Sequence, residues 1–277
     1  MSDTAPSAAV ILLNYNTCQL LLASLHRICA DLLAMGWQVI VVDNGSSDGS
    51  AQAVAEQFPQ VILVVSEQNV GFAAGNNLGL QQARGDAVIL LNTDVIVTPP
   101  QLQALVDFLR HQPDVGAVSP GLRTVDGEPQ SFAYGSAPAP LYLVQRGLRR
   151  LLRRRPLHDW AIRAPIDADW VSGACLAVRT TAYRQVGGLD ERFFLYFEDV
   201  DWCTRIRQGG WRVVYNPTIQ VIHLGGQSEI KRTVANQFYV NSLRTYYQTY
   251  YPYVPARLLD IVLRVYYTLL ARQNARD

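Results

Sequence analysis

Residues 8–16 read AAVILLNYN, an apolar run that ends abruptly in polar side chains. Runs of this length without strict alternation are typical of strands buried on both faces, as in a parallel sheet. Further runs of the same kind lie at Gln38–Val42, Val61–Val65 and Ala87–Leu91. They are separated by helical patterns over Cys18–Met35, Ser50–Gln57 and Ala73–Ala83. This order predicts an α/β fold in which helices cross over between parallel strands.

The composition of the 277-residue chain narrows the class of protein. Hydrophobic residues make up 49%, charged residues 17%, and the net charge is +1. These values exclude a disordered chain and argue against a nucleic-acid-binding protein, which is usually strongly basic. No run reaches the roughly 18 apolar residues of a membrane span, and the N-terminus has no basic leader. The scattered cysteines, Cys18, Cys29, Cys175 and Cys203, fit a reducing compartment. We expect a cytoplasmic protein without a nucleic-acid partner.

Polar side chains follow each of the expected strands. They are Asn14-Tyr15-Asn16, residues 43–49 (DNGSSDG), residues 69–72 (NVGF) and Asn92-Thr93-Asp94. Ligands of open α/β sheets bind beyond the carboxyl ends of the strands, so the pattern predicts a ligand site. The alternative is that these are ordinary turn residues, because Asn, Asp, Gly and Ser dominate loops.

Common nucleotide and hydrolase motifs are absent from the sequence. There is no GxGxxG after the first strand, no GxxxxGK[ST] and no GxSxG. A dinucleotide-binding fold, a P-loop NTPase and an α/β-hydrolase are therefore disfavoured. A sugar-phosphate nucleotidyltransferase would need a Gly- and Arg-rich loop with a nearby lysine, whereas the only lysine is Lys231.

Four acidic or imidazole side chains are candidates for chemistry: Asp94, Glu198, Asp199 and His223. Asp94 ends an apolar strand, where a carboxylate is a good ligand for Mg²⁺ or Mn²⁺, although it could simply cap the next helix. Glu198 and Asp199 follow an aromatic run, and a crowded apolar setting favours a general base. The alternative there is a helix start, with Asp201 paired to Arg205. His223 ends a strand-like run and is either a metal ligand or a structural residue.

The remaining segments suggest contact surfaces. The Arg146–Arg155 segment contains six arginines and an apolar face at helical spacing, which indicates either a helix lying on an anionic membrane or a solvated helix or loop. Residues 230–277 look helical and are rich in tyrosine, which suits a membrane interface or a helix-packing core.

Together these segments resemble family 2 glycosyltransferases, the inverting enzymes with a GT-A fold, and within them a bacterial rhamnosyltransferase-type subgroup. The stretches run in the family's order across roughly residues 8–225. They are VILLNYN (10–16), VVDNGSSD (41–48), NVGFAAGNN (69–77), LNTD (91–94), WVSGAC (170–175), GGLDERFF (187–194), EDVD (198–201) and the His223 strand. The resemblance implies a mostly parallel central sheet flanked by helices in a GT-A domain at 1–227. Its halves are 1–120 for the nucleotide-sugar and 121–227 for the acceptor, with a C-terminal helical extension at 228–277.

The resemblance also implies roles for individual residues. Tyr15 would lie against the nucleobase and Asp43 would accept a hydrogen bond from a pyrimidine N–H. Asp94 matches the last position of the family's DxD motif, and Asn92 replaces the first. The metal ligands would be Asp94 and His223, the catalytic base Asp199, and Glu198 the acid before it. The full nucleotide-binding set would be Asn14, Tyr15, Asp43, Asn69, Gly71, Asn76, Asn92, Thr93 and Asp94. The acceptor set would be Trp170, Ser172, Gly173 and Trp202, with Trp202 as a stacking platform.

The implied activity is an inverting hexosyltransferase that uses Mg²⁺ or Mn²⁺. Its donor would be a pyrimidine nucleoside-diphosphate sugar, dTDP-rhamnose first, with UDP-hexose or UDP-galactofuranose as alternatives. Its acceptor would be a glycan or polyprenyl-linked hydroxyl in cell-surface polysaccharide synthesis, which places the protein peripherally on the inner membrane face. The alternative is a catalytically decayed nucleotide-sugar-binding or scaffold protein, favoured only by the loss of the first DxD acid.

Overall fold

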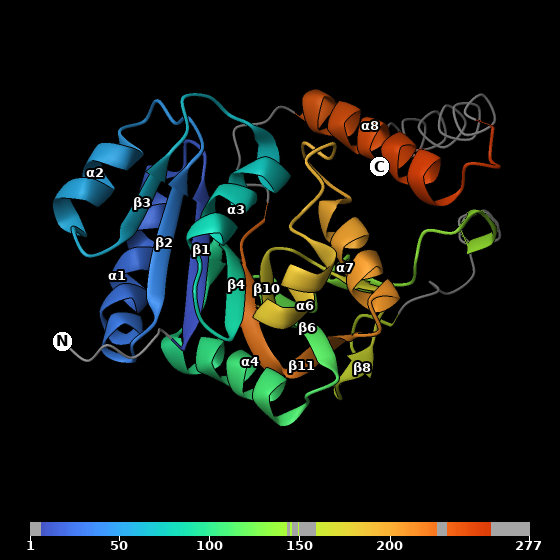
Figure 1. Ribbon diagram of the computed structural model, residues 1–277, viewed down its shortest axis with the longest axis horizontal. Coiled ribbons are helices and arrows are strands. Elements are labelled where there is room, and N and C mark those ends of the chain that lie inside the picture. The colour runs from blue at the N-terminus through green and yellow to red at the C-terminus, as the bar shows by residue number, and fades with distance from the viewer. Residues whose placement is uncertain (1–6, 143–144, 146–148, 150–158, 226–231, 256–277) are drawn as a thin grey trace.

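A mixed nine-stranded sheet runs through the centre of the computed structural model (Figure 1), which describes residues 7–142, 145, 149, 159–225 and 232–255. Its main path is β3 (Ile62–Val65), β2 (Gln38–Asp43), β1 (Ala8–Asn14), β4 (Ala87–Asn92), β10 (Cys175–Arg179), β6 (Val115–Arg123), β11 (Arg212–His223) and β5 (Val95–Ile96). In addition, β8 (Ile166–Asp167) pairs with β11, and β7 (Tyr134–Gly135) pairs with β9 (Trp170–Val171) in a separate ribbon.

The first four strands form the parallel part of the sheet that the sequence predicts. In β1, Asn14 pairs with Asp43 of β2 and Leu13 pairs with Asn92 of β4. The carboxyl ends of β1, β2 and β4 therefore lie side by side at one edge. Beyond β4 the pattern changes, because β10 is antiparallel to both β4 and β6.

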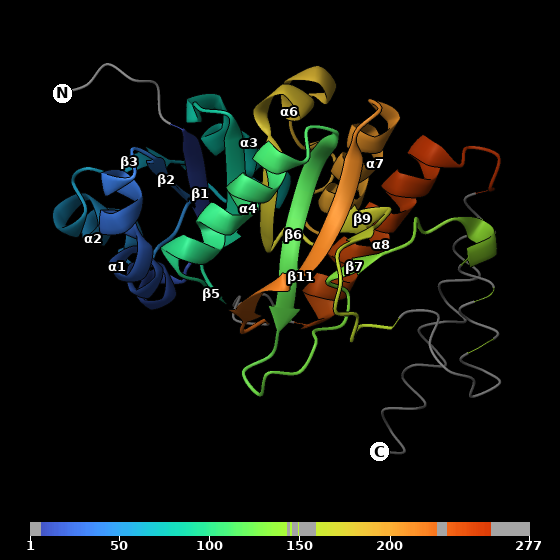
Figure 2. The ribbon, with the colours of Figure 1, turned by 90° about the horizontal axis from the view of Figure 1, so that it is seen from below.

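Helices cover both faces of the sheet. One face carries α1 (Cys18–Ala34), α2 (Ser50–Gln57) and α4 (Pro99–His111), and the other carries α3 (Gly71–Gln82), α6 (Thr180–Val186) and α7 (Glu198–Gln208), as Figure 2 shows most clearly for α4 and α7. Right-handed crossovers explain why α3 lies on the face opposite to α1 and α2. The chain moves from β1 to β3 in one direction along the sheet and then returns to β4 in the other direction, so the connecting helix changes face. The predicted class, a mostly parallel sheet flanked by helices, is confirmed.

The helix α8 (Arg232–Tyr250) packs beside α7 (Figure 1). A second apolar cluster joins α7 and α8 and is separate from the main core, which the strands form with the helices on both faces of the sheet. It contains Phe193, Phe197, Val200, Leu243, Tyr246 and Tyr247. No helix among the described residues could cross a membrane. The division of the chain at residue 227 stays a prediction. Most of the Arg146–Arg155 segment, which we call the Arg-rich block, and residues 256–277 lie outside the described residues.

One acceptor prediction is wrong because of how α7 packs. Trp202 is completely buried in the main core, and its indole N–H donates to the Gly187 carbonyl oxygen at 2.9 Å. A sugar needs an exposed ring face, which Trp202 does not present.

We expect Trp202→Ala to lower the free energy of unfolding by about 3–5 kcal/mol, the usual cost of removing a buried tryptophan. Urea denaturation would measure the change. The matched control is Gln208→Ala at the exposed end of the same helix, which should change stability by less than about 0.5 kcal/mol. An equal effect of the two substitutions would contradict the packing described for α7.

Candidate active site

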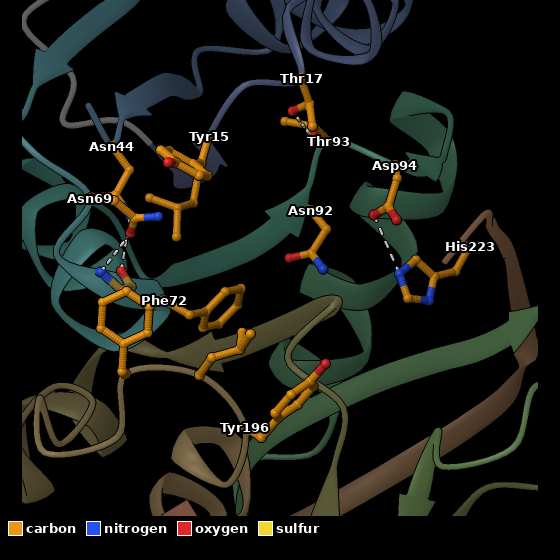
Figure 3. Close-up of a pocket in the computed structure, with 14 residues that line it drawn as sticks. Tyr15, Thr17, Asn44, Asn69, Phe72, Asn92, Thr93, Asp94, Tyr196 and His223 are labelled. Atoms are coloured by element: carbon orange, nitrogen blue, oxygen red, sulfur yellow. Dashed lines mark hydrogen bonds and ion pairs between the residues drawn. The ribbon is translucent and has the colours of Figure 1, made fainter. Parts of the chain in front are cut away.

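A pocket of about 270 Å³ opens at the carboxyl edge of β1 and β4 (Figure 3). We call it the strand-edge pocket. Its walls come from the strand ends, the start of α3, the loop before α7 and the end of β11. The lining residues are Leu13, Tyr15, Thr17, Asn44, Asn69, Gly71, Phe72, Asn92, Thr93, Asp94, Phe194, Leu195, Tyr196 and His223. The sequence therefore predicted Tyr15, Asn69, Gly71, residues 92–94 and His223 at one location.

One end of the pocket is built from Tyr15, Asn44 and Asn69 (Figure 3). We call this end the amide wall. The Asn44 side-chain amide donates to Asn69 Oδ1 at 3.0 Å and to the Gly71 carbonyl oxygen at 3.1 Å. Asn44 Oδ1 accepts from the Val70 N–H at 3.0 Å. The loop after β2 is thus fixed to the start of α3. A rigid polar wall next to an aromatic ring suits a flat heterocyclic ligand with hydrogen-bonding edges.

Three predicted nucleotide contacts lie behind this wall, which corrects the sequence prediction. Asn14, Asp43 and Asn76 are buried and do not line the pocket. Asn14 donates to Asp43 Oδ1 at 3.0 Å, and the Ser46 N–H donates to Asp43 Oδ2 at 3.1 Å. Asn76 donates to the Phe72 carbonyl oxygen at 2.9 Å. These three side chains therefore support the loops around the pocket. In this conformation of the protein, a ligand in the pocket would contact the lining residues and not these three.

The opposite end of the pocket brings Asp94 and His223 together. The antiparallel pairing of β5 with β11 sets His223 against Val95, and the Leu224 N–H donates to the Asp94 carbonyl oxygen at 3.0 Å. His223 Nε2 then lies 3.3 Å from Asp94 Oδ1 (Figure 3). His223 Nδ1 lies 2.8 Å from Gln130 Oε1, so the assigned orientation of the Gln130 amide gives Nδ1 the proton. With the Nδ1 proton directed at Gln130, Nε2 is the ring nitrogen that faces the carboxylate and could bind a metal ion.

This pair fits one divalent ion. Ligand atoms at about 2.1 Å from an octahedral ion lie about 3 Å apart, close to the observed separation of Nε2 and Oδ1. An imidazole nitrogen and a carboxylate oxygen are also common ligands of divalent ions. No group of three or more Asp, Glu, His or Cys side chains within the described residues could hold a metal. A bound ion would therefore need further oxygen ligands from a substrate, as Mg²⁺ usually does.

The carboxylates Glu198 and Asp199 begin α7. Asp199 is partly exposed and accepts the Gly173 N–H at 3.0 Å and the Val200 N–H at 2.8 Å. Burial raises the pKa of Asp199, while these N–H donors oppose the rise. Burial, followed by the charge of Asp199, raises the pKa of Glu198 well above its ordinary value. Glu198 Oε2 is buried without a hydrogen-bond partner among the described residues.

These two environments separate the roles of the carboxylates. The proton belongs on Glu198, whose Oε2 has no hydrogen-bond partner among the described residues, and the charge belongs on Asp199, which accepts the Gly173 and Val200 N–H groups. A partly exposed carboxylate with a raised pKa is suited to accept a proton.

Of the predicted acceptor residues, Gly173 contacts Asp199 through its backbone N–H. A Cβ on Gly173 would be 3.5 Å from Asp199 Cβ and 3.5 Å from Phe72 Cε1, so Gly173 sits between the carboxylate and the pocket wall. Trp170 packs over Gly135 and donates from its indole to the Ser136 carbonyl oxygen at 3.0 Å. The Ser172 N–H donates to the Ala133 carbonyl oxygen at 2.9 Å.

Several lining residues were missed by the sequence reasoning. They are Leu13, Thr17, Asn44, Phe72, Phe194, Leu195 and Tyr196. Asn44 and Phe72 lie inside quoted motifs, so the position of the motif could have indicated them. The aromatic run before Glu198 was noticed for its effect on the acids, and not as a pocket wall.

Comparison with known proteins identifies relatives of the chain. The family model "Glycosyl transferase family 2" matches residues 9–166. An N-acetylglucosaminyl-diphospho-decaprenol L-rhamnosyltransferase of Mycobacterium tuberculosis is 35% identical over 205 residues, which cover 67% of this chain and 66% of that protein. The match therefore spans slightly less than two thirds of this relative.

Solved glycosyltransferase structures share the fold. A mannosyltransferase from Pyrobaculum calidifontis, in complex with GDP-Man and Mn²⁺, superposes with a TM-score of 0.59 at 22% identity, covering 89% of this chain and 65% of that one. GalNAc-T7 with UDP, GalNAc and Mn²⁺ also gives a TM-score of 0.59, at 17% identity, covering 88% of this chain and 48% of that one. The fold is therefore the GT-A fold, as predicted.

We expect Glu198→Gln to gain stability relative to the wild type as the pH rises from about 4 to 8. The folded protein holds a proton on Glu198 that the unfolded chain releases above about pH 4.3. The stability from this group is thus complete below the unfolded pKa and is lost as the pH rises towards the folded pKa. The loss is at most about 1.4 kcal/mol per pH unit, and the neutral glutamine lacks it.

Urea unfolding across this pH range would measure the difference between the two proteins. Glu67→Gln, at an exposed position, is the matched control and should follow the wild type. If the curves for Glu198→Gln and the wild type stay parallel, Glu198 does not hold a proton in the folded protein.

Proposed function

The chain belongs to glycosyltransferase family 2 and is a glycosyltransferase, and we propose that it transfers a sugar from a nucleoside diphosphate to an acceptor hydroxyl with inversion. The observation that carries this proposal is the arrangement of the strand-edge pocket. An aromatic and amide wall stands at one end, the Asp94–His223 pair at the other, and Asp199 beside the pocket next to Gly173. A nucleotide, a diphosphate and an activated hydroxyl need groups of these three kinds.

The nucleobase is proposed to lie against Tyr15, with the Asn69 side-chain amide offering hydrogen bonds to its edge. Asp43 and Asn44 are both buried, and Asn44 already donates both amide hydrogens within the protein, so the reading of the pyrimidine is assigned to Asn69. A sugar linked to dTDP or UDP remains the proposed donor, on the sequence resemblance.

The diphosphate is proposed to lie near Asp94 and His223. Mg²⁺ or Mn²⁺ held by these residues would offset the negative charge that develops on the departing diphosphate. Asn92 and Thr93 line the pocket, and the Asn92 side-chain amide can donate hydrogen bonds to phosphate oxygens. The Thr17 hydroxyl donates to Asn14 Oδ1 at 2.7 Å, so the Thr93 hydroxyl, 2.9 Å from Thr17 Oγ1, donates to Thr17.

Asp199 is proposed to take the proton of the acceptor hydroxyl. The oxygen that loses its proton attacks the anomeric carbon from the face opposite the diphosphate, so the configuration inverts. The Gly173 and Val200 N–H groups orient the carboxylate and keep it charged, while the neutral Glu198 avoids a second buried charge. Trp170 and Ser172, which precede Gly173 in the chain, are proposed to contact the acceptor.

Rhamnose is the proposed sugar, and the acceptor is a glycan or lipid-linked hydroxyl. Support comes from the 35% identical relative, whose name specifies L-rhamnosyl transfer to N-acetylglucosaminyl-diphospho-decaprenol. A membrane-borne acceptor would suit a protein on the inner membrane face. That part of the proposal rests on the sequences of the Arg146–Arg155 segment and of the Tyr-rich residues 230–277.

We expect Asp199→Asn to lower kcat by about 10²–10⁴-fold, the usual contribution of a general base. The dissociation constant for the donor should stay nearly unchanged, because Asp199 acts on the acceptor. Steady-state transfer assays and donor titration would measure both quantities. Asp126→Asn, on an exposed turn, is the control. Near-full turnover of Asp199→Asn would assign the base to another residue.

We expect a thermal-shift panel of dTDP, UDP, GDP and ADP, with and without Mn²⁺, to show stabilisation by pyrimidine nucleotides. A ligand at about 100 times its dissociation constant stabilises the fold by about 2.7 kcal/mol. The metal-dependent part of the shift should disappear in Asp94→Ala and persist in Asp126→Ala. A shift that Asp94→Ala leaves intact would refute the metal assignment, and no shift with any nucleotide would favour a decayed site.

A further inference from the structure

Tyr196 occupies a distinct position in the strand-edge pocket. Its ring points into the pocket from the wall that faces Asn92 (Figure 3), and the residue is 40% exposed. It lies between the amide wall and the Asp94–His223 pair, and three positions before Asp199 in the chain.

The backbone at this position is strained. Tyr196 has φ +69° and Phe197 has φ +67°, a left-handed conformation that bulky residues rarely adopt. Consecutive residues of this kind persist only where the surrounding structure holds them, and they cluster at ligand-binding and active sites. The turn directs the Tyr196 side chain into the pocket and the Phe197 side chain in another direction, where it is buried.

Helix α8 holds this turn in place. Phe197 packs against Tyr239 and Tyr246, with ring centroids 5.3 and 5.6 Å apart. The Ser242 hydroxyl donates to the Leu195 carbonyl oxygen at 2.8 Å, just before the turn. Phe194 stacks on Phe238 at 4.5 Å. The exposed Tyr196 ring is thus held in place before a ligand binds. Binding to it costs little conformational entropy, because its backbone is already ordered.

The proposed chemistry leaves one part of the donor without a contact. The nucleobase and the diphosphate are assigned to the two ends of the pocket, and the acceptor oxygen must approach from Asp199. The transferred sugar is bonded to the diphosphate and has to lie within reach of that oxygen. Among the pocket residues, Tyr196 is the one that lies closest to Asp199 along the chain and faces the phosphate end.

We propose that Tyr196 contacts the transferred sugar of the donor and contributes to the choice of that sugar. The apolar ring suits the C–H face of a hexose or deoxyhexose, and the phenol hydroxyl can exchange hydrogen bonds with a ring hydroxyl. The inference rests on the proposed function and adds the residue that recognises the sugar.

The test compares a nucleoside diphosphate with its sugar conjugate, dTDP with dTDP-rhamnose and UDP with UDP-glucose, by calorimetric titration with Mn²⁺. The variants are Tyr196→Asn, which keeps a residue tolerant of positive φ, and Tyr196→Phe, which removes only the hydroxyl. Tyr253→Asn, at a 73% exposed tyrosine outside the pocket, is the matched control.

We expect Tyr196→Asn to bind the nucleoside diphosphate as the wild type does and to bind the sugar conjugate about three- to tenfold more weakly, the range of a good aromatic contact. A value for Tyr196→Phe near the wild type assigns the contact to the ring, and a value near Tyr196→Asn assigns it to the hydroxyl. The ratio of kcat/KM for the two sugar donors should also change in Tyr196→Asn and stay constant in Tyr253→Asn.

Two other results would overturn the inference. If Tyr196→Asn weakens the nucleoside diphosphate and the conjugate equally, or weakens neither, Tyr196 does not contact the sugar. If the wild-type protein itself binds neither nucleotide, the proposed function fails before any variant is compared, so the two failures are distinguishable.

Discussion

The rest of the site depends on the close approach of Gly71 to Phe194. The Phe72 N–H donates to the Phe194 carbonyl oxygen at 2.7 Å, and a Cβ on Gly71 would lie 2.6 Å from that oxygen. Gly71 also has φ +90°, so only glycine meets both demands. Through this contact the start of α3 touches the turn before α7, and the amide wall joins the wall that carries Tyr196. A pocket between distant parts of the chain is the result.

Local sequence patterns were sufficient to predict strands β1 to β4 and the helix between β2 and β3. The predicted helix Ser50–Gln57 has the observed bounds, and the expected pair of Asp201 and Arg205 forms at 2.7 Å. The four predicted strands agree with β1 to β4 within one residue at each end. These features depend on side-chain periodicity and on neighbours four positions apart, which a sequence displays directly. The polar ends of β1, β2 and β4 meet for the same reason, because parallel pairing aligns their carboxyl ends.

The parts that sequence reasoning missed depend on contacts between remote segments. Asp43 follows a strand as a binding residue would, but the Asn14 and Ser46 groups enclose its oxygens. Trp202 sits on a helix that packs its indole inward, which the sequence of α7 does not reveal. The positive φ of Tyr196 contradicts the preference of aromatic residues, so no propensity rule predicts it. It exists because α8, far along the chain, supplies the cluster that stabilises the turn.

The division of the site along the chain has a consequence for how specificity is arranged. The family model ends at residue 166, so it includes Tyr15 and Asp94 and stops before Tyr196, Asp199 and His223. The amide wall therefore belongs to the matched segment, and the turn that we propose to face the sugar lies just before α7. Strain in that turn is offset by apolar contacts with α8, which do not involve β1 to β4. A substitution in the turn or in α8 can thus alter the part of the pocket around Tyr196 while the ends of β1, β2 and β4 keep their register.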